Sequence, residues 1–273
     1  MISWAEKGTY MKLFSFELSG QFAFFKKNDF NDVFQVSYNF IHKPVVLGII
    51  GAILGFKGYT KQKELPEYYK KLHPLKISIV PHYKEPLPKQ LSVFNNASGL
   101  GSKEKGAWQI REQILVGKPM ITYTIYVLDD HSVEDSIISR LKEKLKKGET
   151  VYNLYFGKNE FFAYHQNFFD AYKIESLTES ECIIDSLINK GDGDETVSFI
   201  GYDFDTFDSL DFGSPLSHTV FEYLPIKLDN MGFYEKEMFI LTQRRLRINR
   251  SDGFYRIIKY ENALVKTTNV QFI

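Results

Sequence analysis

The residues best suited to a binding chemistry stand close together near the amino terminus. Residues 21–37 contain FAFFKKNDFNDV, in which four phenylalanines are interleaved with Lys26, Lys27 and Asn31. The stretch has no clear period, so it is predicted to be a loop with exposed aromatic and cationic side chains. Aromatic rings stack on nucleobases and cations follow the phosphate chain, which is how single-stranded nucleic acid is held. The loop is therefore a candidate nucleic-acid contact.

A second group of cations lies near the carboxyl terminus. Segments 244–249 and 254–260 flank the turn Ser-Asp-Gly and are predicted to form a hairpin, in which Arg245, Arg247 and Asn249 share a face. At a strand rise of ~3.3 Å per residue the two arginines repeat every ~6.6 Å, comparable with the phosphate spacing of an extended single strand. A charged outer face that guards an edge strand explains the same residues. Both interpretations stay open.

The well-marked catalytic motifs are absent from the sequence. There is no Walker loop, dinucleotide fingerprint, HExxH or GxSxG. The six histidines are scattered, and His73 and His82 would lie at opposite ends of one strand, which makes them poor co-ligands. Asp203 and Asp205 lack the glycine and closing glutamate of a calcium loop. Cys182 stands among apolar residues, which predicts a buried, inert thiol. Neither a metal nor a cofactor is expected.

Composition indicates a globular protein of one large domain or two small ones. The 273 residues are 44% hydrophobic and 25% charged. A single cysteine excludes an internal disulfide framework and fits a reducing compartment, so a cytoplasmic protein is predicted. The first ten residues have no basic region followed by an apolar run, so no signal peptide is expected. Either Met1 or Met11 could be the native start.

Charge is balanced overall but unevenly distributed. There are 34 basic and 34 acidic residues, yet residues 191–226 contain no Lys or Arg and eight acidic residues. That acidic segment should repel a phosphate chain, so it is predicted to face away from any bound nucleic acid. Residues 236–259 show the opposite balance, with seven basic residues against two acidic ones.

An apolar helix is predicted directly after Lys43. Pro44 suits the first helical position, where its missing N–H costs nothing, and the chain stays apolar to Phe56. Small residues recur at helical spacing along one face and are Gly48, Gly51, Ala52 and Gly55. Such a stripe predicts close approach of another backbone. Thirteen apolar residues are too few to cross a bilayer, so no membrane partner is expected.

The remaining pattern predicts an α+β fold. Strands are expected at 12–19, 75–80, 121–128, 151–156 and 161–169. A short helix is expected at 65–72, and a second long one begins with Ser132 and Asp135 at capping-box spacing and stops at Gly148. Residues 81–119 are broken by proline, glycine and asparagine, which predicts a protruding hairpin that orders on a partner.

The order of these elements is β-α-β-excursion-β-α-β over the first ~170 residues, the split βαβ order of ferredoxin-like and RRM-type sheets. We therefore expect an RRM-like domain at 11–175 with a thumb-like insertion at about 82–118. Residues 176–273 are expected to form a β-rich extension of antiparallel structure, including a hairpin of 224–228 with 237–242.

Three blocks, taken in order, resemble the CRISPR-associated protein 5 family, the RAMP subunit of type I Cascade complexes, and its subtype I-B branch in particular. They are KLFSFELSGQFAFFKK at 12–27, SYNFIHKPVVLGIIGAILG at 37–55 and VYNLYFGKNEFFA at 151–163. Each block alone is a modest signal, but the three in order are specific. The resemblance covers residues 12–164 well and is weak beyond them.

The resemblance implies a non-catalytic, RNA-binding subunit of the Cascade ribonucleoprotein in antiviral defence. Such a subunit binds the 5′ handle of crRNA (CRISPR RNA) and caps the backbone-subunit filament. It lies beside the large subunit, with target DNA near the PAM as a further partner. Single-stranded RNA is recognised by stacking and phosphate contacts. The residues expected to contact RNA are Phe22, Phe25, Lys26, Lys27, Tyr38, Lys43, Lys103, Lys105, Arg111, Lys158, Arg245 and Arg247.

Two alternatives remain. The subtype I-C branch of the family cuts precursor RNA with Tyr, Lys and His side chains. Metal-free cleavage needs a base near the 2′-hydroxyl and an acid near the leaving oxygen. Tyr38, His42 and Lys43 are the adjacent set of suitable types, so a metal-independent endoribonuclease acting on CRISPR repeat RNA is the first alternative. A protein-docking module without RNA contact, suggested by zero net charge and the acidic segment, is the second.

Overall fold

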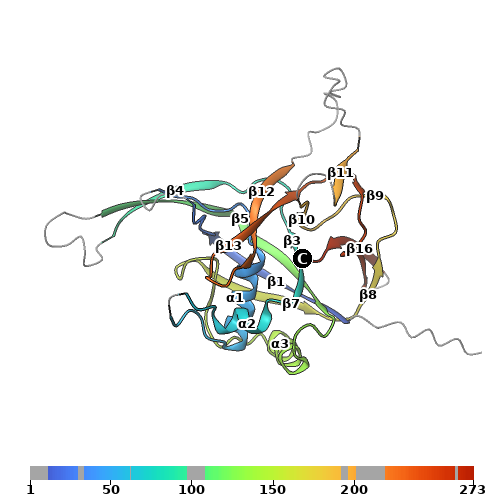
Figure 1. The fold of residues 1–273 in the computed structure, drawn as a ribbon, viewed down its shortest axis with the longest axis horizontal. Coiled ribbons are helices and arrows are strands. Elements are labelled where there is room, and N and C mark those ends of the chain that lie inside the picture. Colours follow the sequence, from blue (N-terminus) through green and yellow to red (C-terminus); the bar gives the residue numbers. More distant parts are fainter. Residues whose placement is uncertain are drawn as a thin grey trace, which may run out of the picture.

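A computed structural model describes residues 12–29, 34–61, 63–96, 108–191, 196–200, 219–261 and 264–273. It is a mixed α+β structure, rich in strands and with few helices (Figure 1). The strands of the main sheet are β1 (Lys12–Ala23), β2 (Phe34–Gln35), β3 (Lys76–Pro81), β4 (Lys89–Asn96), β5 (Trp108–Asp129), β6 (Leu154–Tyr155) and β7 (Phe162–Phe169). The helices are α1 (Lys43–Leu54), α2 (Glu67–Leu72) and α3 (Asp135–Lys147).

The main sheet has the neighbour order β3-β5-β1-β7, and every one of these pairs is antiparallel. Helix α1 lies in the connection from β1 to β3, and α3 lies in the connection from β5 to β7. Alternation sets the two faces of the sheet, since Phe14, Phe16 and Leu18 of β1 are fully buried in the core that also contains α1 and α3. The strands predicted at 12–19, 75–80 and 121–128 are confirmed.

Helix α1 begins at Lys43, as predicted, and its small-residue stripe packs against the protein's own chain. A Cβ added to Gly51 would lie 2.4 Å from the Cβ of Tyr68 in α2, and one added to Gly48 would lie 3.7 Å from the same ring. The predicted approach of another backbone is therefore wrong at these two glycines, because the Tyr68 side chain fills the stripe. No helix in the described ranges is long and apolar enough to cross a membrane.

Helix α3 differs from its prediction at its first turn. The residue that precedes it is Glu134, which makes no side-chain capping hydrogen bond. The predicted cap, Ser132, instead donates its hydroxyl to the carbonyl of Pro74, 3.2 Å away. A capping serine must accept from the helix's free N–H groups, and this hydroxyl faces a neighbouring segment instead. The helix packs on the core through Ile138, Leu141 and Leu145, which are buried, and it ends at Gly148 as predicted.

The predicted protruding hairpin is confirmed. Strand β4 pairs with the first half of β5 from Lys89↔Leu115 to Asn96↔Trp108, and the pair projects from the body (Figure 1). We call residues 89–96 and 108–116 the thumb. Along the other edge of β5, Phe34 of β2 pairs in parallel with Arg111. Lys103 and Lys105 lie outside the described residues.

The second half of the chain forms three small antiparallel sheets. Their neighbour orders are β10-β13-β12, β11-β14-β9 and β16-β15-β8. The strands are β8 (Tyr172–Ser176), β9 (Glu181–Cys182), β10 (Ile188–Asn189), β11 (Val197–Phe199), β12 (Val220–Leu228), β13 (Tyr234–Leu241), β14 (Leu246–Ile248), β15 (Phe254–Glu261) and β16 (Leu264–Gln271). The β12-β13 hairpin was predicted correctly.

The predicted pairing of 244–249 with 254–260 is wrong. Strand β14 pairs with β9 and β11, whereas β15 pairs with β8 and β16. The two segments flank a sequence that favours a turn. Other strands nevertheless occupy both edges of β14 and both edges of β15. The small sheets also share cores with the main sheet: Leu224 and Phe239 join its helix side, and Ile257 and Phe272 pack on Leu13 of its other face.

Candidate nucleic-acid interface

The aromatic and cationic stretch after β1 is a folded hairpin, not an open loop. Lys27 N–H donates to Val36 O at 2.8 Å, and Tyr38 N–H donates to Phe25 O at 2.8 Å. Phe24 and Phe25 are 4% and 1% exposed, so the expectation of exposed aromatic rings is wrong for both. Tyr38, a predicted RNA contact that follows this stretch, is also only 1% exposed. Phe22 is half-buried, with its ring centroid 5.9 Å from that of Phe161.

One end of this hairpin is held by an acidic side chain from the second half of the chain. Lys27 Nζ lies 2.6 Å from Glu222 Oε1, and the other carboxylate oxygen accepts the N–H of Asn39 at 2.8 Å. Glu222 belongs to the acidic segment that was predicted to face away from any bound nucleic acid, and that prediction stays open. Lys27 supplies the cation partner that the buried Glu222 carboxylate requires. Asp29 forms a second ion pair, with Lys236 of β13.

A cavity of about 500 Å³ opens where the hairpin meets β12 and β13, and we call it the β12 cavity. Lys27, Tyr38 and Asn39 line it on the hairpin side, and Phe221, Tyr223 and Lys236 line it on the other. The Tyr38 hydroxyl is buried and has no hydrogen-bond partner among the described residues. Burial, helped by the negative charges of Asp29 and Glu222, raises the pKa of Tyr38, so the hydroxyl stays protonated and available as a donor.

The three candidate catalytic side chains lie near one another but do not share an open site. The rings of Tyr38 and His42 meet edge to face with centroids 5.4 Å apart, and His42 is only 3% exposed. Lys43 Nζ donates to the carbonyl of Ile273 at 3.1 Å. Burial, and then the charge of Lys76, lowers the pKa of Lys43 to about 8. A general base must reach the substrate's proton, and a buried imidazole does not.

Burial makes His42 a source of acid sensitivity. It lowers the pKa of His42 from 6.5 to about 3, so the folded protein keeps the imidazole neutral while the unfolded chain takes up a proton. The contribution of the neutral His42 to the free energy of unfolding is complete above about pH 6.5. It is lost as the pH falls below that value, at roughly 1.4 kcal/mol per pH unit. We expect His42→Phe to remove this slope in denaturant unfolding measured from pH 6.5 to 4.5. Equal slopes in variant and wild type would contradict it.

The other predicted RNA contacts are mostly paired within the chain. Lys158 Nζ lies 2.7 Å from Glu112 Oε2, midway along the thumb, and 4.8 Å from the ring centroid of Phe94. Arg247 bonds Glu181 Oε1 at 3.0 Å, and Arg245 donates to the carbonyl of the same residue at 3.3 Å. Strand β14 is the central strand of its sheet, with β9 and β11 on its two edges, so the edge-guarding interpretation is wrong. The pairing of both arginines with Glu181 makes them part of a charged outer face, and their contact with phosphates stays a prediction.

Arg111 is different, because its side chain is exposed on the thumb. Its backbone pairs with Val93 on one side and Phe34 on the other, and these two side chains are 48% and 41% exposed. Residues directly opposite across strands share a face of the sheet. The thumb therefore presents a cation between an aromatic and an aliphatic side chain.

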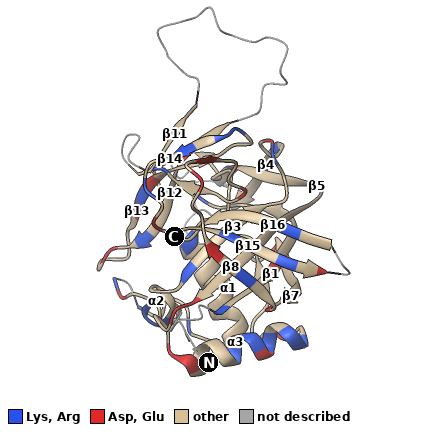
Figure 2. Cartoon of the chain, turned by 90° about the vertical axis from the view of Figure 1, so that its right-hand side faces the viewer, with Lys and Arg blue, Asp and Glu red and all other residues tan. Residues whose placement is uncertain are grey.

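The basic face of α3 is a network of ion pairs. Lys142, Lys144, Lys146 and Lys147 each lie within 4.0 Å of an acidic oxygen. Figure 2 shows Lys and Arg along α3 with some Asp or Glu among them. Pairs of this kind are typical of a solvated face.

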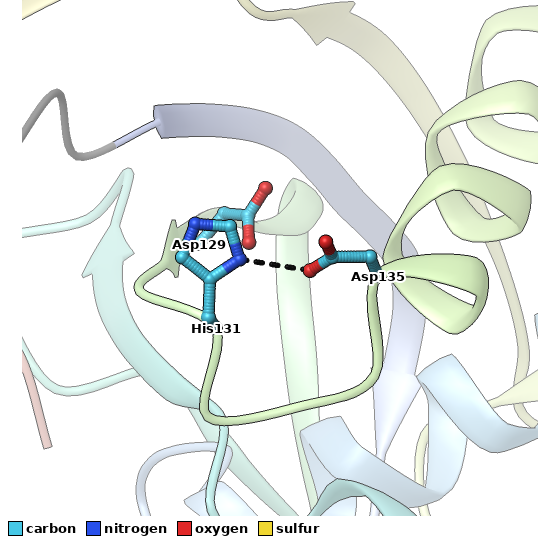
Figure 3. A group of neighbouring side chains, drawn as sticks. All are labelled: Asp129, His131 and Asp135. Carbon is cyan, nitrogen blue, oxygen red and sulfur yellow. Dashed lines mark hydrogen bonds and ion pairs between the residues drawn. The ribbon is translucent and has the colours of Figure 1, made fainter.

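Asp129, His131 and Asp135 gather at the start of α3, with one potential ligand atom from each within 4.8 Å of the others (Figure 3). His131 Nδ1 lies 2.8 Å from Asp135 Oδ1, and that hydrogen bond raises the pKa of His131. Lys142 Nζ lies 3.5 Å from Asp129 Oδ2. Because the imidazole favours its protonated form and an ammonium already faces the buried carboxylate, we interpret the group as an ion-pair network.

Comparisons with known proteins show similarity to solved structures only. No family model matches the sequence, and no curated protein matches it. A chain of a CRISPR RNA-guided surveillance complex is 9% identical with a TM-score of 0.44, covering 86% of this chain and 90% of that one. A CRISPR protein from Archaeoglobus fulgidus is 11% identical with a TM-score of 0.44, covering 94% and 99%. A chain of the Type III-B Cmr-beta complex bound to target RNA is 13% identical with a TM-score of 0.42, covering 85% and 86%.

Sequence reasoning missed the contribution of β12 and β13 to this interface. Phe221 and Tyr223 flank Glu222, so the aromatic rings and the carboxylate point to opposite faces of the strand. The alternation of residue types at 220–224 was visible in the sequence. Nothing in the sequence indicated, however, that this strand lies beside the hairpin after β1.

Proposed function

We propose that this chain is a non-catalytic, single-stranded RNA-binding subunit of a type I CRISPR effector complex. In detail, it is a CRISPR-associated protein 5 of subtype I-B that binds the 5′ handle of crRNA and caps the backbone filament in the cytoplasm. The order β3-β5-β1-β7 with helices in two crossovers supports the further proposal of a ferredoxin-like, RRM-type domain with the thumb as its insertion. Its partners would be the backbone subunit, the large subunit and target DNA near the PAM.

One observation carries this proposal: the hairpin after β1 and the thumb are neighbours. The hairpin bridges Lys26 to Ser37, and its second strand, β2, pairs with β5 at Arg111. The hairpin after β1 and the thumb are thereby joined in one sheet, although they lie about 80 residues apart in the chain. Both were selected from the sequence for their cations or aromatic rings. Cations that follow a backbone beside aromatic rings are the usual design of a single-strand site.

The structure supports different roles for the selected residues. Lys26, Phe22 and Arg111 are at least partly exposed and are proposed as direct contacts, whereas an RNA contact by Lys27 requires exchange of its partner Glu222. Phe25 and Tyr38 are proposed to support the hairpin from beneath, since both are buried. For Lys43, Lys158, Arg245 and Arg247 an RNA contact requires exchange of the intramolecular partners described above. Lys103 and Lys105 keep their proposed role on the thumb.

The proposal predicts salt-dependent binding of repeat-derived single-stranded RNA. With ~4 phosphates neutralised, a plot of log affinity against log salt should have a slope of about −3, and Arg111→Gln should reduce its magnitude by ~0.7. Fluorescence anisotropy with a labelled oligonucleotide measures both. Lys147→Gln on α3 is the matched control and should leave the slope unchanged. Salt-independent binding, or no binding even with backbone subunits present, would count against an RNA role.

A further inference from the structure

The β12 cavity is lined by groups that suit a nucleotide. Lys27 and Tyr38 are among the predicted RNA contacts, but the groups of β12 and β13 are not. On its outer side, Phe221 and Tyr223 are 51% and 55% exposed, although both are large apolar side chains. They stand two residues apart on β12 and therefore project from the same face of the strand. The ring of Phe199 in β11 supports Phe221, with centroids 5.8 Å apart. Aromatic side chains displayed in this way on a sheet are how RRM-type surfaces stack two or three bases.

The polar groups of the cavity suit a phosphodiester and a base edge. Tyr38 is one of the residues that line the cavity, and its buried hydroxyl lacks a hydrogen-bond partner among the described residues. Within the part of the chain that the structure describes, Lys236 has Asp29 as its ion-pair partner, and the Asp29 side chain is 64% exposed. Exposed pairs are weak, so a phosphate can take the place of Asp29 at little cost. Lys27 is held more firmly, because its partner Glu222 is buried.

We infer that Phe221 and Tyr223 form a base-stacking shelf for single-stranded RNA and that Lys236 beside them contacts a phosphate. This inference rests on the proposed RNA-binding function and extends it, because it assigns part of the RNA site to the C-terminal β-structure. Lys27, which lines the same cavity, links the shelf to the hairpin after β1, and β2 links that hairpin to Arg111 of the thumb. One strand could follow this line from the thumb to the shelf.

Nucleic acid fits these groups better than a protein partner does. A protein-docking face needs apolar area, and Lys27 and Lys236, which line the cavity, would have to be desolvated further on docking. Lysines are usual contacts of phosphates. An extended RNA strand also keeps part of the cavity wet, so Glu222 and Asp29 need not be buried further.

The test measures the affinity of the full-length protein for repeat-derived single-stranded RNA with 2-aminopurine placed at each position in turn. Stacking is worth ~1–3 kcal/mol per base, so the double variant Phe221→Ala, Tyr223→Ala should bind about 10- to 100-fold more weakly with an unchanged salt slope. It should also abolish the fluorescence quenching of one or two 2-aminopurine positions. Lys236→Gln should instead reduce the salt slope by ~0.7.

Two further variants keep the result interpretable. Phe233→Ala is the matched control, because Phe233 is 67% exposed on the same hairpin but does not line the cavity, and it should bind RNA like the wild type. Tyr223→Phe retains the ring and should bind within about twofold of the wild type. Near wild-type binding by this variant shows that the double variant's loss comes from its missing rings and not from a disturbed β12.

The outcomes separate this inference from the proposed function. If the wild type binds RNA and the double variant binds equally well, the shelf is wrong and the RNA-binding function stands. If the wild type binds no RNA, both are wrong. If the double variant binds RNA normally but no longer joins the other effector subunits, Phe221 and Tyr223 are a protein-docking surface and the shelf is overturned.

Discussion

Gly157→Ala is expected to destabilise the protein by more than about 4 kcal/mol. Gly157 has φ +86°, and a Cβ built on it would lie 1.8 Å from the carbonyl oxygen of Phe24. A left-handed conformation costs an L-residue ~1–2 kcal/mol, and a collision with backbone adds to it because no rotamer can relieve it. The turn must then move, and with it Lys158, which pairs with Glu112 of the thumb. Denaturant unfolding monitored by tryptophan fluorescence and circular dichroism measures the change.

Gly148→Ala is the matched control for this effect. Gly148 follows α3 with φ +70°, nearly the same conformation, but nothing lies within 4 Å of an added Cβ. The control should therefore show the conformational cost alone, ~1–2 kcal/mol. Equal losses for the two variants would mean that the turn at 157–160 does not press against the end of β1 as described.

Lys27→Met is expected to destabilise the protein by roughly 3–5 kcal/mol, because it leaves the buried carboxylate of Glu222 without its cation. Glu222→Gln should cost only ~1 kcal/mol. Its amide oxygen still accepts the Asn39 N–H, and Lys27 can turn toward solvent. The asymmetry follows from exposure, since the lysine side chain is 22% exposed and the glutamate side chain 4%.

The double variant Lys27→Met, Glu222→Gln completes the cycle. Removing both charges removes the uncompensated carboxylate, so it should be more stable than Lys27→Met alone by ~2 kcal/mol. Urea unfolding at pH 7 gives all four free energies. Additive losses would show that Lys27 and Glu222 do not interact, and the hairpin after β1 would then not be anchored to β12.

Local pattern was enough to find most elements of the main sheet. The alternation of Phe14, Phe16 and Leu18 predicted a strand with one buried face, and these side chains are buried. Pro44 marked the start of α1, and the run of turn residues at 81–119 marked the thumb. Each of these features depends on neighbours two to four positions away, and such spacing is written directly in the sequence.

Pairing and burial across the chain could not be obtained in this way. The turn at 251–253 suggested a hairpin, yet Leu246 pairs with Cys182 and Phe199 while Phe254 pairs with Gln271. The phenylalanines after β1 suggested an exposed loop, yet Phe25 fits edge to face against Phe156. Strand edges and apolar faces accept any partner of suitable shape, so the partner is chosen by the packing of the whole chain.

By itself, the sequence determined an α+β chain with a glycine-striped helix after Lys43, a projecting thumb and an aromatic, cationic segment suited to RNA. Only the tertiary structure decided which of these groups are free to act. It paired Lys27 with Glu222 and Lys158 with Glu112, buried Tyr38 and His42, and exposed Phe221 and Tyr223 beside them. The reason is physical: charge and stacking act through space over a few ångströms, and residues nearly 200 positions apart reach that distance only when the fold is complete.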